Sequence, residues 1–303
     1  KEFLDLAEQL KSSVSCTVRL NELMSGHTSF KIGGPADILV LPESIEQLRE
    51  VLKVVKETVV PLTLLGNGSN VLVRDKGIRG IVIKLGNMLR HFYEAEDLLV
   101  FGSGYSLALA SYKAMECGKT GMEFAVGIPG SIGGAVYMNA GAYDGEMQNI
   151  VNCVKVMDLQ GNERVLTAEE LNFGYRKTSL QNSGLIVTEV TLKMPSGNKD
   201  EIKSKMDDFS HRRISKQPLE MPSAGSMFKR PPGYFAGTLI DQAGLKGYTV
   251  GGAQISTKHA GFVVNVGGAT AADVLQLIKD VQTKIKAGVG VELQPEVLVI
   301  GEE

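Results

Sequence analysis

The stretch AVGIPGSIGGAVYMNAGAY, residues 125–143, contains five glycines among small apolar residues and no charged side chain. Glycine has no Cβ and permits a positive φ, so a backbone of this composition can approach a ligand closely. Successive N–H groups without side-chain cover then form a concavity that can hold an anion such as a pyrophosphate. The stretch therefore predicts a loop that presses backbone against a large flat or phosphorylated ligand.

A second glycine-rich segment lies upstream and reads PLTLLGNGSNVLVRD, residues 61–75. The apolar run 62–65 ends in Gly-Asn-Gly-Ser-Asn and resumes at Val71, which indicates a strand, a tight polar turn and another strand. Alone, such a turn is typical of an ordinary hairpin. Two glycine-dense loops in one chain favour a shared nucleotide-like ligand.

The rest of the chain mixes helical and strand patterns without strict βαβ alternation, which favours an α+β fold over a doubly wound sheet. Helices are expected at 1–14, after a capping box at 44–47, at 106–117, after a second capping box at 167–170, at 202–213, at 235–243 and after Thr270. Strands are expected at 98–101, 149–158, 163–166, 185–194, 261–266 and 291–300. Gly102 and Gly104 imitate a dinucleotide fingerprint, but Leu107 replaces its third glycine, which counts against a Rossmann domain.

Bulk properties narrow the class of protein. With 303 residues and 43% hydrophobic content, the chain can form two or three ordinary domains. A net charge of −2 and the lack of a long basic block argue against nucleic acid as a partner. The three cysteines are isolated, which favours a reducing, cytoplasmic location, and the four histidines lack metal-ligand spacing. No apolar run approaches the roughly 18 residues of a membrane span, so no membrane insertion is expected.

Three further segments carry candidate chemistry: GYRKT at 174–178, PSAGSMFKRP at 222–231 and LQPEV at 293–297. Arg176 could be a surface cation, and Ser226 could cap a turn, as most loop serines do. Glu296 is harder to explain in this way. A carboxylate inside an apolar strand is expected to be partly buried and to need a partner.

Together with HTSFKIGG at 27–34, these segments resemble the UDP-N-acetylenolpyruvoylglucosamine reductase family over nearly the whole chain. The compact region 226–296 is similar to the shorter, type II form of that family. The resemblance implies a PCMH-type FAD-binding fold of two α+β subdomains followed by an α+β substrate-binding domain. The expected boundaries are 1–85, to which a C-terminal strand 297–303 returns, then 86–195 and 196–303.

The resemblance also implies a flavoenzyme of peptidoglycan precursor synthesis. NADPH would reduce a noncovalent FAD, and flavin N5 would pass hydride to C3 of the enolpyruvyl ether of UDP-N-acetylglucosamine, yielding UDP-N-acetylmuramate. By this resemblance Arg176 holds the substrate carboxylate, Ser226 delivers a proton to C2, and Glu296 orients and stabilises the enol form. Tyr175, Lys229 and Arg230 are candidates for holding the substrate, and no metal is expected. The FAD-binding candidates are Gly66, Asn67, Gly68, Ser69, Asn70, Gly127, Ile128, Pro129, Gly130, Ser131 and Gly133.

Two other interpretations stay open at this point. A PCMH-type flavin oxidase of a small alcohol or amine would fit the glycine loops, although no histidine or cysteine is an obvious point of covalent flavin attachment. A non-catalytic sugar-nucleotide sensor would bind a UDP-sugar without flavin. One departure from the family is Thr178, where many relatives carry serine. We expect a monomer that acts in the cytoplasm.

Overall fold

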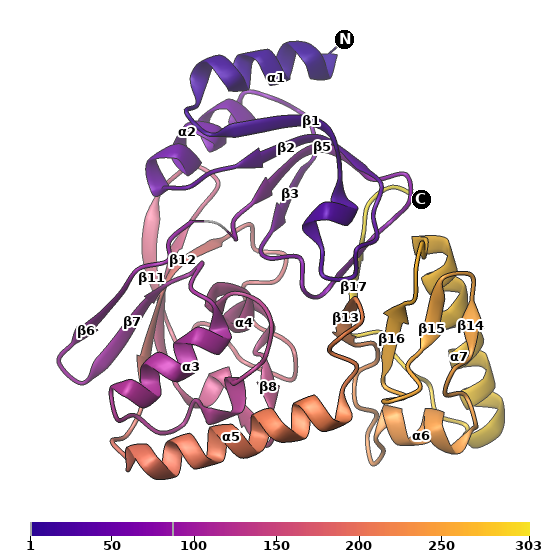
Figure 1. Ribbon diagram of the computed structural model, residues 1–303. Coiled ribbons are helices and arrows are strands. Elements are labelled where there is room, and N and C mark those ends of the chain that lie inside the picture. The colour runs from indigo at the N-terminus through magenta and orange to yellow at the C-terminus, as the bar shows by residue number, and fades with distance from the viewer. Residues whose placement is uncertain (1, 87) are drawn as a thin grey trace. The chain divides into compact units, whose positions relative to one another are not determined.

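The computed structural model describes residues 2–86 and 88–303 (Figure 1). The chain forms two compact units, each assembled from separate stretches of sequence. The first unit comprises Lys1–Val18, Val40–Asn67 and Ile83–Arg213, and the second comprises Arg19–Leu39, Gly68–Val82 and Ile214–Glu303. The helix expected at 1–14 is α1 (Glu2–Ser13), and Lys1 lies outside the described residues.

An antiparallel sheet with strand order β11-β10-β12-β7-β6 forms the centre of the first unit. Its strands are β6 (Phe92–Ala95), β7 (Leu98–Gly102), β10 (Val151–Met157), β11 (Glu163–Thr167) and β12 (Ile186–Lys193). Side chains of α3 (Leu107–Glu116) and α4 (Ile132–Met138) share one buried core with this sheet. Smaller elements of the unit are α2 (Ile45–Lys56), the 3-10 turns η2 (Glu123–Ala125) and η3 (Met147–Asn149), and the hairpin β8 (Gly141–Ala142) with β9 (Gly145–Glu146).

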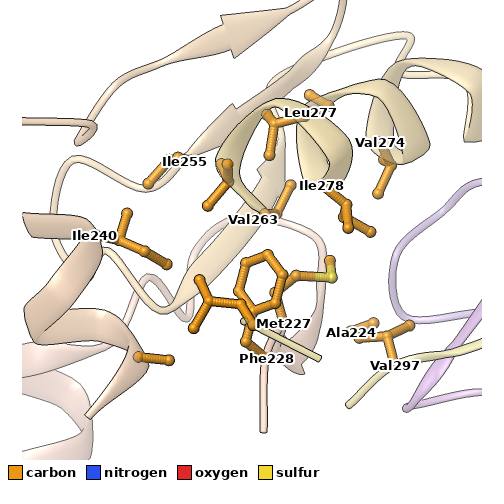
Figure 2. Close-up of a cluster of buried hydrophobic side chains, with 14 of the residues drawn as sticks. Ala224, Met227, Phe228, Ile240, Ile255, Val263, Val274, Leu277, Ile278 and Val297 are labelled. Carbon is orange, nitrogen blue, oxygen red and sulfur yellow. The ribbon is translucent and has the colours of Figure 1, made fainter. Parts of the chain in front are cut away.

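The second unit contains an antiparallel sheet with strand order β13-β16-β15-β14. Its strands are β13 (Ser223–Ser226), β14 (Thr249–Val250), β15 (Ala253–Ile255) and β16 (Phe262–Asn265). Helices α6 (Ala236–Gln242) and α7 (Ala271–Val289) pack with these strands around an apolar cluster that includes Val263, Val274 and Ile278 (Figure 2). In the same unit, β17 (Leu298–Ile300) pairs in parallel with β4 (Val71–Val73).

A further sheet has the order β1-β2-β5-β3. Its strands are β1 (Thr17–Leu23), β2 (Pro35–Leu41), β5 (Ile78–Lys84) and β3 (Leu62–Leu65), and the 3-10 turn η1 (Met24–His27) follows β1. The five central residues of β2 are all buried, as in a strand covered on both faces. The antiparallel sheets and separate helices confirm the α+β class.

Most helix starts follow their sequence signals. Thr270 forms a complete capping box with Asp273 at the start of α7, and Ser106 caps α3. At α2 only half of the expected box forms. Ser44 Oγ accepts from the Gln47 N–H at 3.1 Å, but Gln47 Oε1 accepts from the Glu43 N–H instead of from that of Ser44.

Four of the expected elements need correction. Thr167 and Glu170 form their reciprocal hydrogen bonds, yet only turns follow, because Asn172 reverses the chain at φ 45°. Helix α5 (Lys199–Lys216) runs past the basic residues 211–213, because Arg213 continues its buried face. The strand expected at 291–300 is regular only at Leu298–Ile300. The two strands beside the first glycine loop do not form one hairpin, because they lie in different sheets: Leu62–Leu65 in one and Val71–Val73 in another.

Candidate functional site

Ser226 lies at the end of β13, in the second unit. The strand pairs antiparallel with β16 so that Ser226 is opposite Phe262, and the Ser226 side chain is exposed. The next two residues, Met227 and Phe228, point into the apolar cluster (Figure 2). The burial of both residues fixes the chain directly after the exposed serine.

The backbone of Glu296 is bonded directly to this segment. The Glu296 N–H donates to Met227 O at 2.8 Å, and the Lys229 N–H donates to Gln294 O at 2.8 Å, on either side of a bridge between Phe228 and Pro295. Glu296 itself is half-buried, as the apolar flanks indicated, and its neighbours Leu293 and Val297 are buried. The structure therefore brings Ser226 and Glu296 together through one short backbone ladder.

Asn70, the last residue of the first glycine loop, borders the same ladder. Its side-chain amide donates to Glu296 O at 3.5 Å, and Asn70 O accepts from the Leu298 N–H at 3.0 Å. Asn70 thus clamps the chain on both sides of Val297, where the glutamate segment passes into β17. This contact links a cofactor-loop candidate to a catalytic candidate within one unit.

The first glycine loop, residues 66–70, connects β3 to β4. Gly68 has φ +68°, and a Cβ there would collide with the carbonyl oxygen of His27. The Ser29 N–H donates to Gly68 O at 3.0 Å. Glycine at 68 is therefore required by the chain's own packing.

The second glycine loop lies between η2 and α4 in the first unit. Gly127 and Gly130 have φ +75° and +109°, and Ser131 caps α4 by accepting from the Gly134 N–H at 3.2 Å. A Cβ on Gly66 would lie 3.8 Å from Ser131 Oγ with no closer heavy atom. The two loops therefore face each other across space that a side chain at Gly66 would enter.

This arrangement fits a dinucleotide such as FAD. Within the first unit, the exposed Gly127 and the half-exposed Gly66 and Gly130, together with the Ser131 hydroxyl, offer hydrogen-bonding groups for phosphates. Gly66, Asn67 and residues 127–133 belong to the first unit, and Gly68, Ser69 and Asn70 to the second.

Arg176 belongs to the first unit and lies in an irregular turn. Gly174 and Lys177 exchange backbone hydrogen bonds of 2.9 and 3.2 Å around it, and Arg176 has φ +50°. Its guanidinium donates to Asn139 O at 3.3 Å and to Gly141 O at 3.1 Å. The half-buried guanidinium plane is therefore fixed by two carbonyls, which suits bidentate binding of a carboxylate.

The substrate-binding candidates are more exposed. Tyr175 lies 4.9 Å from the Arg176 guanidinium in a cation–π contact. Lys229 is half-buried, and the exposed Arg230 packs 4.1 Å over the ring of Phe235. Lys229 and Arg230 follow Ser226 by three and four residues, so all three lie on one continuous segment of the second unit.

Within residues 2–86 and 88–303, no group of three or more histidine, cysteine or acidic side chains could hold a metal ion. His27 pairs with Glu22 and His91 with Glu189, each at 3.0 Å. His259 is half-buried and its Nδ1 accepts from the Gly261 N–H at 3.0 Å. Burial lowers the pKa of this imidazole, and Lys246 and Lys216 lower the pKa further. In the same described ranges, no helix combines the length and apolar character of a membrane span.

Asn139 is a residue that the sequence reasoning missed. It lies inside the opening glycine-rich stretch, is fully buried and ends α4 in the left-handed conformation. A faint signal exists in the sequence, because asparagine after an apolar helical run is a common left-handed cap. The contact of its carbonyl with Arg176, 37 residues away, has no local signal.

Comparison with known proteins gives two matching family models. Residues 36–167 match an FAD binding domain, and residues 217–300 match the C-terminal domain of UDP-N-acetylenolpyruvoylglucosamine reductase. A reductase of that name from Clostridium perfringens is 50% identical over 302 residues, covering 100% of this chain and 98% of its own length. The one from Clostridioides difficile is 49% identical over 286 residues, covering 94% of each.

A solved structure is also similar. The UDP-N-acetylenolpyruvylglucosamine reductase from Thermus caldophilus aligns with a TM-score of 0.78 at 38% identity, covering 94% of this chain and 98% of that one. This similarity and the matching FAD domain confirm the PCMH-type fold expected from the sequence.

Proposed function

Since the chain belongs to the UDP-N-acetylenolpyruvoylglucosamine reductase family, we propose that Arg176, Ser226 and Glu296 are its catalytic residues. The chain is an FAD-dependent oxidoreductase that uses NADPH to reduce the enolpyruvyl ether of UDP-N-acetylglucosamine to UDP-N-acetylmuramate, a step of peptidoglycan precursor synthesis. Full-length relatives favour this activity over the flavin oxidase that the glycine loops also allowed.

The observation that carries the assignment is the ladder joining Ser226 to Glu296. Residues 227–229 and 294–296 hold each other by two backbone hydrogen bonds of 2.8 Å. These bonds fix a hydroxyl and a carboxylate on adjacent extended segments of one unit, which is the pairing that proton delivery to a developing enolate needs.

Bound FAD supplies the hydride that reaches C3 of the enolpyruvyl group. Ser226 Oγ then gives the proton to C2, and the Glu296 carboxylate orients and stabilises the enol form. Arg176 holds the substrate carboxylate with its planar guanidinium, whose orientation the carbonyls of Asn139 and Gly141 fix. Because charge on that carboxylate grows as the reaction proceeds, this contact strengthens toward the transition state.

The remaining assignments are proposals of the same kind. Tyr175, Lys229 and Arg230 contact the substrate, with the two cations directed at its diphosphate. The two glycine loops hold FAD without a covalent bond, which their mutual approach at Gly66 and Ser131 supports.

Free thiols at Cys16, Cys117 and Cys153 support a reducing cytoplasm. That the chain acts as a monomer stays a prediction. The division at 1–85, 86–195 and 196–303 stays a prediction.

Replacing the proton donor tests the proposal. In Ser226→Ala we expect NADPH to reduce the flavin at a near-normal rate, because that step delivers no proton to C2. Reoxidation by the enolpyruvyl substrate should slow by roughly 10² to 10⁴, the usual scale for a lost general acid. Rapid-mixing absorbance of the flavin follows each half-reaction separately.

Ser223→Ala is the matched control, since Ser223 lies on the same strand and its hydroxyl accepts only a local bond from the Gly225 N–H at 3.3 Å. The control should reoxidise like the wild type. If Ser226→Ala also reoxidises at the wild-type rate, Ser226 is not the acid. If it loses flavin or is reduced slowly, the residue is structural.

A further inference from the structure

Asn139 holds four hydrogen-bonding groups in a fully buried position. Its side-chain Nδ2 donates to Gly174 O at 2.8 Å and to the Glu146 carboxylate at 2.9 Å, with Gln148 Oε1 at 3.3 Å. Its Oδ1 accepts from the Gln148 N–H at 3.0 Å. The amide is thereby satisfied on both its donor and its acceptor side, as a buried polar group must be.

The same residue contacts the arginine turn at two places, the backbone of its first residue and the Arg176 side chain. The Asn139 amide holds the carbonyl of Gly174, where the turn begins, and the Asn139 carbonyl accepts from Arg176 Nη1. The turn is only four residues long and closes on itself through Gly174 and Lys177. Asn139 therefore links the backbone of the turn to the tip of the guanidinium.

The left-handed backbone of Asn139 is part of this arrangement. At φ 46° and ψ 57° its N–H still bonds back to the last turn of α4, while the chain leaves toward Gly141, whose carbonyl takes the second arginine bond. Among residues with a side chain, asparagine is one of the few that visit this conformation readily, and it also brings both a donor and an acceptor. Glycine permits the backbone but supplies no amide.

We propose that Asn139 is a positioning residue for substrate binding and reduction, acting by fixing the orientation of Arg176. This inference rests on the proposed role of Arg176. It assigns to Asn139 no contact with substrate or cofactor. Its contribution is to hold the guanidinium at one angle, so that both of its parallel N–H groups meet the substrate carboxylate together.

Asn139→Gly separates the side chain from the backbone conformation. The left-handed turn is retained, and with it the Asn139 carbonyl, but the bonds to Gly174, Glu146 and Gln148 are lost. We expect flavin content and the rate of reduction by NADPH to stay at wild-type level. The substrate concentration that half-saturates flavin reoxidation should rise about 10- to 100-fold, the scale of a misplaced binding group.

Asn172→Gly is the matched control, because Asn172 is exposed and has nearly the same backbone angle, φ 45°. It should behave as the wild type in both half-reactions. Asn139→Asp is a second variant for the case that glycine unfolds the region. Aspartate keeps the acceptor for Gln148 but places a carboxylate against Glu146 and Gly174 O, so reoxidation should again weaken selectively.

A double-mutant cycle with Arg176→Ala decides between positioning and general structural support. If Asn139 acts through Arg176, Asn139→Gly should have no further effect on reoxidation once the guanidinium is absent. Two results would overturn this inference and leave the proposed role of Arg176 intact. In the first, the losses of the two single variants multiply in the double variant. In the second, Asn139→Gly reoxidises at the wild-type rate while Arg176→Ala is impaired. Wild-type reoxidation in Arg176→Ala would instead overturn the proposed role of Arg176, and the inference with it.

Discussion

Ser226 and Arg176 are held in place by different kinds of structure. Ser226 and Glu296 lie on extended segments whose backbones bond to each other and to β16, so their positions follow from strand register. Arg176 lies in a left-handed turn held by contacts with residues far away in sequence: the Asn139 side chain binds Gly174 O, and the Thr178 hydroxyl binds Tyr137 O. A ladder tolerates many side chains, whereas a turn of this kind depends on a few particular ones.

The glycine loops are where one substitution should have the largest effect on cofactor binding. Gly66→Val adds bulk in the space between the loops, where a Cβ contacts only Ser131 Oγ. If the backbone contacts the cofactor there, we expect the variant to lose about 3 kcal/mol of FAD binding free energy, which raises the Kd of FAD roughly 100-fold. Gly68→Val is a poorer probe, because its Cβ would collide with His27 O.

The measurement is flavin absorbance per chain after purification, with added FAD to titrate the Kd. Gly288→Val, at an exposed position in α7 with no atom within 4 Å of the new Cβ, is the control and should retain full flavin. Undiminished FAD affinity in Gly66→Val would place the cofactor elsewhere.

Thr178→Val tests how far the arginine turn depends on single side chains. The buried Thr178 hydroxyl donates to Tyr137 O at 2.7 Å, so valine removes a satisfied hydrogen bond from a buried site. Such a loss costs about 1–3 kcal/mol of folding free energy. We expect a cost at the low end of this range, because Gln181 Nε2 also donates to Tyr137 O and keeps that carbonyl satisfied.

Urea unfolding of the apoprotein measures the cost. Thr191→Val on β12 is the ladder counterpart, where valine suits a strand and should leave stability unchanged or raised. If Thr178→Val and Thr191→Val lower the free energy of unfolding equally, the arginine turn does not depend on single side chains more than a strand ladder does.

The smallest effect concerns pH and the second unit. Burial lowers the pKa of His259 below its usual value of 6.5, so the unfolded chain binds more protons between the folded pKa and 6.5. Stability therefore rises with pH across that window, is fully present above 6.5, and falls as the solution is acidified. In His259→Gln the amide can still accept from the Gly261 N–H, and this part of the acid sensitivity should disappear. Urea midpoints at pH 7.5 and 5.5 compare the two proteins, and parallel losses on acidification would show that His259 contributes nothing.

Sequence patterns predicted what depends on local periodicity. Thr270 and Ser106 cap helices as expected, and the apolar run at 261–266 forms β16. The half-buried state of Glu296 also followed from its flanks. These features arise from neighbours along the chain, where amphipathic spacing and capping act directly.

The sequence patterns failed where distant segments decide the outcome. Thr167 and Glu170 form the expected bonds, but the chain beyond them is recruited into turns that pack near Tyr137 and Asn139. The clamp of Asn70 on Glu296 joins residues 226 positions apart. The catalytic roles themselves came from family resemblance, because one arginine, one serine and one glutamate carry no spacing that marks a site.

Ser226 is proposed to act on the chemical step alone, whereas Arg176 acts on substrate binding and, because its contact strengthens as charge grows on the substrate carboxylate, on the chemical step as well. The most direct test is the rate of flavin reoxidation in Ser226→Ala and Arg176→Lys as a function of substrate concentration. Ser226→Ala should lower the limiting rate and leave the half-saturating concentration near the wild-type value. Arg176→Lys keeps the charge but loses the planar fork, so it should raise the half-saturating concentration about tenfold or more. If both variants lower only the limiting rate, or if the lysine variant matches the wild type, this division of roles is contradicted.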